Sequence, residues 1–247
     1  MYLRLKAIYR ELRSHIPFTC FGALTGIVAM LVFRQASKEV DHSLFLLFHP
    51  AHVLLSAVVT SSLFKLRQGT QNFLTILLVG YFGSIGVATL SDCVVPFYGE
   101  TILNVAVPTH EAIHEAMNQV PAESTESSSR LEKVGPDIHL GFIEDWYVVN
   151  PAALLGILLA FLIPHEKLHT KLPHAAHVLI STWASSFHVL MNLRSALSVT
   201  TLLGIFVVLF IAVWLPCCIS DIIFPMLFVG KDKIPMCCHG HVHEVTS

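Results

Sequence analysis

Charged residues are scarce in this chain. Asp, Glu, Lys and Arg make up 13% of the 247 residues, whereas hydrophobic residues make up 54%. Soluble domains usually carry about 25% charged residues. The formal net charge of −2 also leaves no basic surface for nucleic acid. Long uncharged stretches of roughly 18 or more apolar residues can cross a bilayer. The composition therefore predicts an integral membrane protein, with the lipid bilayer as its first partner.

Several motifs of soluble enzymes are also missing. The sequence has no G-x-x-x-x-G-K-[ST] loop, no G-x-G-x-x-G before a helix, no G-x-S-x-G and no C-x-x-C-H. Their absence argues against ATP-driven transport by this chain alone. None of the six cysteines lies in the long polar segment at 108–145, so we expect no extracellular disulfide framework.

Six apolar stretches stand out, and we expect an all-α polytopic fold with about six transmembrane helices. The stretches cover about 17–33, 44–64, 73–97, 148–163, 174–192 and 199–229. The amino end is basic, which places it in the cytoplasm by the positive-inside rule. An even number of spans then predicts a protein of the cell membrane with both termini in the cytoplasm and the 108–145 segment outside.

An internal repeat organises these stretches. HPAHVLLS (His49 to Ser56) matches HAAHVLIS (His174 to Ser181), and SDCVVP matches SDIIFP further along. LTGI and LLGI match ahead of both pairs, in the same order and at separations of 125 to 130 residues. Because each half holds three spans, the second half enters the membrane from the opposite side. We therefore expect two inverted three-helix repeats.

The repeat defines the predicted organisation of the chain. Residues 1–107 form the first three-helix repeat, 108–145 an extracytoplasmic polar loop, and 146–230 the second repeat. Residues 231–247 form a cytoplasmic tail rich in His and Cys.

Each half carries an H-x-x-H pair and an S-D-x-x-x-P turn. Residues three apart share a helix face, and two imidazoles with a carboxylate suit a divalent transition metal. Counting along the spans places one such set near each membrane face. The predicted metal ligands are His49, His52, Asp92, His174, His177 and Asp221, with Ser56, Ser91, Ser181 and Ser220 in support. A structural alternative is that these groups only pair between helices.

Other groups carry weaker signals. The tail sequence CCHGHVHEV offers soft and borderline ligands, yet a tail of this kind also binds metal without a physiological role. His110 and His114 lie in the polar loop, where a solvated amphipathic helix is the favoured interpretation. Cys217 and Cys218 precede Asp221 by one turn, and they either add sulfur to that site or simply pack.

These observations favour a membrane permease for a divalent transition-metal cation, with Zn, Mn, Fe, Co or Ni as candidates. Protons are the expected counter-ions, because His and Asp lose protons when they bind metal. Two alternatives stay open: an intramembrane metal-dependent hydrolase, and a haem-binding electron-transfer subunit. A transporter is favoured over an enzyme because one active site does not need a duplicated motif. The chain is also a candidate homo-oligomer.

Overall fold

The chain folds into a bundle of helices. The computed structural model describes residues 2–68, 72–103, 141–163, 171–192 and 198–218. Within those ranges the chain is helical apart from short turns, and no strand occurs there, which confirms the all-α prediction. The elements are α1 (Tyr2–Phe33), α2 (Lys38–Gln68), α3 (Phe73–Thr89), the π-helical turn η1 (Leu90–Val94), α4 (Val95–Ile102), α6 (Gly141–Glu144), α7 (Trp146–Leu162), α9 (Lys171–Asn192) and α10 (Val199–Cys218).

Four stretches of these helices are long and apolar enough to cross a membrane: His15–Phe33, Glu39–Lys65, Phe73–Ile102 and Val199–Cys217. Trp146–Leu162 is apolar but shorter. The helix α9 is not among the four, and its buried face is rich in polar side chains.

The bundle is apolar outside and partly polar inside. Large hydrophobic side chains such as Val32 (68% exposed) and Phe82 (65% exposed) point outward. On α10 the exposed positions recur every four residues, at Leu203, Val207, Ile211 and Leu215. Water disfavours so much exposed apolar surface, and hydrocarbon does not. These faces are those expected of a membrane-embedded protein.

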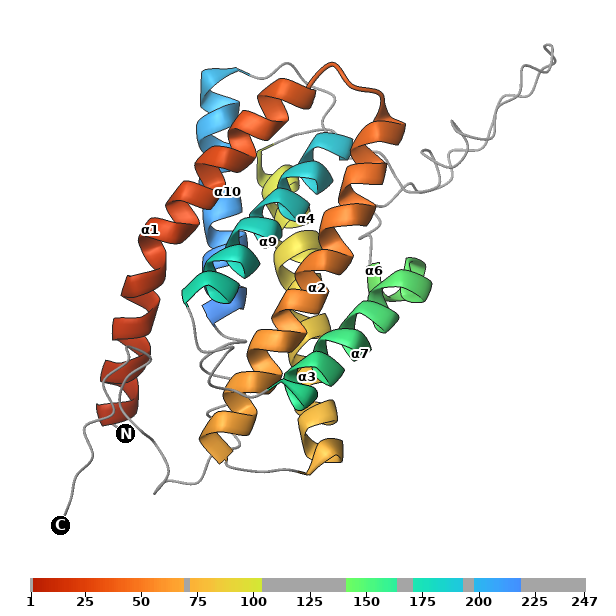
Figure 1. The fold of residues 1–247 in the computed structure, drawn as a ribbon. Coiled ribbons are helices and arrows are strands. Elements are labelled where there is room, and N and C mark those ends of the chain that lie inside the picture. Colours follow the sequence, from red (N-terminus) through yellow and green to blue (C-terminus); the bar gives the residue numbers. More distant parts are fainter. Residues whose placement is uncertain (1, 69–71, 104–140, 164–170, 193–197, 219–247) are drawn as a thin grey trace, which may run out of the picture.

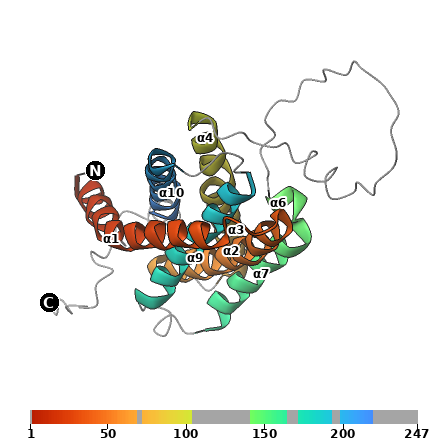
Figure 2. The same ribbon diagram turned by 90° about the horizontal axis from the view of Figure 1, so that it is seen from above.

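The helix α9 lies in the middle of the bundle. It packs against α1, α2, α4, η1 and α10, while α2 packs against α3, α7 and α9. Figure 1 shows α1, α3 and α9 running upward along the chain and α2, α7 and α10 running downward. Seen from above in Figure 2, α9 lies beside α1 and α2, and α7 lies on the side of the bundle away from the N-terminal end of α1.

Glycines on α1 and α7 lie close against the two central helices. A Cβ on Gly26 of α1 would meet the side chains of Ser186 and Thr182 on α9. A Cβ on Gly156 of α7 would meet the backbone carbonyl of Leu54 and the methyl group of Ala57 on α2. Small residues at such contacts let helix backbones come together in a membrane.

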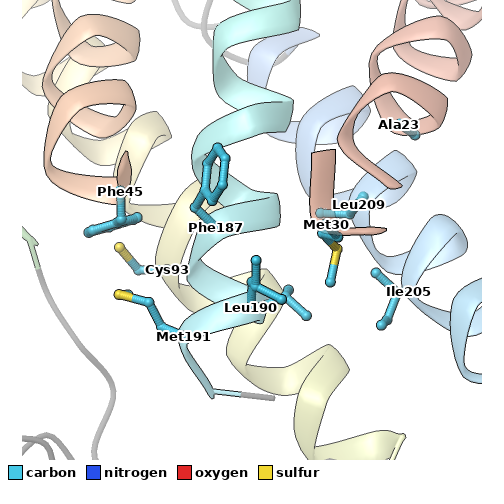
Figure 3. Close-up of a cluster of buried hydrophobic side chains, with 10 residues drawn as sticks. Ala23, Met30, Phe45, Cys93, Phe187, Leu190, Met191, Ile205 and Leu209 are labelled. Atoms are coloured by element: carbon cyan, nitrogen blue, oxygen red, sulfur yellow. The ribbon is translucent and has the colours of Figure 1, made fainter. Parts of the chain in front are cut away.

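Apolar packing fills one end of the bundle. Figure 3 shows side chains from α1, α2, η1, α9 and α10 gathered into one buried cluster, including Phe45, Cys93, Phe187 and Leu209. This apolar cluster therefore joins five elements of the bundle.

Candidate metal centre between α2 and α9

A π-helical turn places the carboxylate of Asp92. The third span does not end near residue 97, where the apolar stretch at 73–97 placed its end, but continues as α4 to Ile102. The Val95 N–H donates to the carbonyl of Leu90, five residues earlier. With the same spacing a residue at 96 would donate to Ser91, but proline has no N–H. The Ser185 hydroxyl of α9 donates to that carbonyl instead, at 3.0 Å.

Asp92 joins both histidines of the first H-x-x-H pair. Its Oδ2 accepts from Nδ1 of His49 at 2.9 Å and from Nδ1 of His52 at 2.7 Å. Asp92 and His52 are completely buried, and His49 is 1% exposed. The sequence predicted this proximity, because an ionisable group inside a membrane needs a partner. The contact is confirmed; a role in metal binding stays a prediction.

The other carboxylate oxygen is held by serines. Oδ1 accepts from the hydroxyls of Ser91 at 2.6 Å and Ser181 at 3.3 Å, and the Ser185 hydroxyl, which donates to the Ser91 carbonyl, lies 3.4 Å away. Ser181 and Ser185 reach it from α9, so the carboxylate ties α2, η1 and α9 together. Both oxygens of Asp92 therefore hold neighbouring side chains, and its role as a metal ligand stays a prediction.

The two copies of the H-x-x-H motif meet beside Asp92, where His52 faces His177. Nε2 of His52 lies 2.9 Å from Nε2 of His177, and the ring centroids are 4.8 Å apart. Because the Nδ1 hydrogen of neutral His52 goes to Asp92, its Nε2 carries a lone pair. His177 in its Nε2–H form donates to this lone pair, which accounts for the 2.9 Å contact. Asp92 thus directs the free lone pair of His52 at the second histidine, as a carboxylate does behind a metal-binding histidine.

Cys217 of α10 completes the group. Its Sγ lies 3.9 Å from Nε2 of His177 and 3.8 Å from the Ser181 hydroxyl. The ligand atoms of His52, His177 and Cys217 all lie within 4.8 Å of one another, and all three residues are buried. Tetrahedral Zn takes N at about 2.0–2.1 Å and S at about 2.3 Å, which places ligand atoms about 3.3–3.6 Å apart. Small side-chain rotations would bring these three atoms to that spacing.

The placement of the two motif copies differs from the prediction. Counting along the sequence put one His/Asp set near each membrane face, whereas His52 and His177 meet in a single site. The physical reason lies in the helix lengths. The helix α2 is 31 residues long, so His52 lies near its middle. Figure 1 shows α9 beginning beside the middle of α2 and not level with its end.

The remaining predicted residues divide into two groups. The buried Nε2 of His49 and the buried hydroxyl of Ser56 have no hydrogen-bond partner among the described residues. His49 also stacks on Phe45, with ring centroids 5.1 Å apart. The side chain of His174, together with Ser220 and Asp221, lies outside the described part of the chain, as do His110, His114 and the CCHGHVHEV tail.

Cys217 was not among the predicted ligands. Its signal in the sequence was its place one turn before the second S-D-x-x-x-P motif, which fits packing equally well. No known protein family, no curated protein and no solved structure matches the chain. The chemistry of this site therefore has to be argued from its own geometry.

Proposed function

We propose that the protein is a membrane permease for a borderline divalent transition metal, bound between His52, His177 and Cys217. The carrying observation is the 2.9 Å approach of the two Nε2 atoms, with Asp92 behind one ring. Two imidazoles and a thiolate suit Zn, Co and Ni better than Mn, which prefers oxygen ligands. The nitrogen and sulfur donors thus favour Zn, Co and Ni among the metal ions that the sequence suggested.

Packing supports an inverted repeat in which α1, α2 and α3–η1–α4 correspond to α7, α9 and α10. Under this correspondence each contact of one half has a counterpart in the other. The α2–α7 contact corresponds to α9–α1, the α2–α3 contact to α9–α10, and the α3–α7 contact to α10–α1. All six contacts occur. Paired helices run in opposite directions in Figure 1. In such folds the substrate site lies near the bilayer midplane at the repeat interface.

The glycine contacts support the same inverted-repeat relation between the two halves. Gly26 and Gly156 occupy matching places in LTGI and LLGI. Gly26 packs on Thr182 of α9, and Gly156 packs on Ala57 of α2. Thr182 and Ala57 themselves correspond, because each is the residue that directly follows its copy of the aligned HAAHVLIS and HPAHVLLS segments. The pair His52 and His177 then lies on the axis that relates the halves, which explains why one site serves both.

The site suits alternating access. Its ligands are buried, so this is a closed arrangement in which neither side of the bundle has direct access to them. Rocking of one repeat against the other would open the site to one side at a time. A divalent ion that binds here would take the place of the hydrogen between the imidazoles and would displace the thiol proton, so metal entry would release at least one proton. We also propose the cell membrane as location, with both termini in the cytoplasm.

Geometry disfavours the two alternatives. Two histidines that ligate one haem iron from opposite faces need Nε2 atoms about 4 Å apart across the macrocycle, since Fe–N bonds are about 2.0 Å long, as for other imidazole ligands. The rings of His52 and His177 are too close for that. A hydrolase needs an open metal position for water and substrate, whereas this group is enclosed by Ser181 and Asp92.

Metal flux into proteoliposomes tests the proposal. Purified full-length protein is reconstituted, and Zn²⁺ entry is followed with an enclosed fluorescent chelator. We expect flux in the wild type, a loss of at least about tenfold in Cys217→Ser, and no change in Cys20→Ser, which alters a half-buried cysteine of α1. Equal flux with and without the wild-type protein would reject the permease.

A further inference from the structure

A second buried ionisable pair lies at one end of the bundle. Nδ1 of His188 on α9 lies 3.2 Å from Oε1 of Glu100 on α4. Glu100 is 1% exposed and His188 is 2% exposed. Sequence analysis singled out neither residue. A carboxylate inside a membrane bundle is costly and usually marks an ion pathway or a proton relay.

The pair is aligned with the metal centre along two elements. His188 follows His177 by eleven residues, about three helical turns, so both lie on one face of α9. Ser181 and Ser185 occupy the same face between them and contact Asp92. Glu100 follows Asp92 on the continuous span that runs through η1 and α4. The two ionisable pairs are therefore consecutive stations along the same helices.

One aromatic ring separates the stations. Phe45 stacks on His49 with centroids 5.1 Å apart and meets His188 edge-on at 5.7 Å. Phe45 is completely buried, and Figure 3 shows it within the apolar cluster. The buried Nε2 of His49 has no hydrogen-bond partner among the described residues. A small displacement of Phe45 would open a path for a proton from His49 to His188.

Among the described residues, few other charged groups lie on the elements around Glu100 and His188. At the end of the bundle where Glu100 and His188 lie, the titratable groups of α2 are Glu39, Asp41 and His42. The exposed Arg34 follows α1. From η1, Asp92 and Cys93 are the nearest titratable groups. The helix α10, which packs against α4, carries no Asp, Glu, His, Lys or Arg between Val199 and Cys217. Among described residues the pair offers only two ligand atoms and belongs to no group of three metal-binding side chains.

We propose that Glu100 and His188 are a proton-binding station in series with the metal centre, which makes metal movement proton-coupled. This rests on the proposed permease function. When a divalent ion enters the centre, the protons that it displaces leave past His49 and Phe45. Glu100 and His188 take up a proton and pass it to the membrane face at this end. A metal ion would need more ligand atoms than these two side chains offer among the described residues, whereas a proton needs only one carboxylate or imidazole.

Two flux measurements on one set of proteoliposomes test the station. Net Zn²⁺ entry is driven by a pH gradient, with an enclosed pH indicator reporting proton exit. Exchange of isotopically labelled Zn²⁺ is measured with zinc on both sides and no gradient, where no net proton movement is needed. For Glu100→Gln we expect net flux and proton exit to fall at least tenfold, with exchange and Zn²⁺ affinity within about twofold of wild type. Glu100→Asp should restore coupling.

The outcomes separate the two proposals. Wild-type protein that moves no zinc overturns both the permease and the station. Wild-type zinc flux without proton exit, or unchanged coupling in Glu100→Gln, overturns the station and leaves the permease. If Glu100→Gln does not elute as a folded protein on gel filtration, His188→Gln is measured instead. That variant keeps the carboxylate, and loss of coupling with retained exchange is again the expected result. Glu39→Gln, an exposed carboxylate of α2, is the control.

Discussion

Nε2 of His52 and Nε2 of His177 lie 2.9 Å apart, and each belongs to one copy of the duplicated H-x-x-H motif. Within the described part of the chain, the two motif copies thus meet at one place. The carboxylate of Asp92 holds the first ring through Nδ1, and the thiol of Cys217 stands beside the second. The arrangement accounts for the burial of histidines, a carboxylate and a cysteine between helices whose outer faces are apolar.

Asp92→Asn should weaken metal binding without removing a ligand. The amide keeps the shape of the side chain but loses the negative charge that fixes the Nδ1 hydrogen of His52. Loss of such a carboxylate behind a metal-binding histidine typically costs 10–100-fold in affinity. We expect a change of about that size in Co²⁺ affinity, measured by absorption titration in detergent. An affinity within twofold of wild type would mean that Asp92 does not orient the ligand.

Ser185→Ala should destabilise the bundle, and Pro96→Ala should reduce that cost. Ser185 satisfies the carbonyl of Ser91, which Pro96 leaves without a backbone donor. A buried carbonyl without a partner costs about 1–3 kcal/mol. In the Pro96→Ala background the new N–H can serve this carbonyl, so the serine should matter less. Unfolding of the two single variants and the double variant gives the coupling directly. Strict additivity would disprove this account of the kinked span.

Gly156→Ala should destabilise the protein, whereas Gly86→Ala should not. A methyl group at 156 would meet the carbonyl of Leu54, which belongs to the backbone and cannot rotate away. Overpacking of this kind costs about 1–3 kcal/mol. Gly86 is an exposed helical glycine with nothing within 4 Å of a Cβ, so it is a matched control. Thermal unfolding of both variants in the same detergent measures the difference. A smaller effect at 156 than at 86 would contradict close packing of α7 on α2.

Much of the fold could be predicted from the sequence, because the bilayer imposes simple rules. Low charge and long apolar stretches indicated the helices, and four of them are long and apolar enough to span. The contact between Asp92 and the first H-x-x-H pair followed from the cost of an isolated carboxylate in hydrocarbon. These inferences depend on local composition and on depth alone.

The joining of the two motif copies could not be predicted in the same way. Depth was counted from the ends of apolar stretches, and those ends misplaced the motifs. The third apolar stretch stops near residue 97 in the sequence, but a π-helical turn and the Ser185 hydroxyl let the span continue past Pro96 to Ile102. Cys217 carried no distinctive pattern, because a buried cysteine in an apolar helix usually packs. Glu100 and His188 were missed because neither belongs to a repeated motif.

Metal content of the single histidine variants tests the central claim most directly. Wild type, His52→Ala, His177→Ala, the double variant His52→Ala/His177→Ala and the control His42→Ala are loaded with Co²⁺ or Zn²⁺, freed of excess metal and analysed for metal per chain. The difference from wild type removes any contribution of the His/Cys-rich tail, which all five proteins share. One shared centre predicts that each of His52→Ala and His177→Ala loses one full equivalent, and that the double variant loses no more. Two independent centres would lose one equivalent in each single variant and two in the double variant. That result, or an unchanged metal content in both single variants, would contradict a shared centre between α2 and α9.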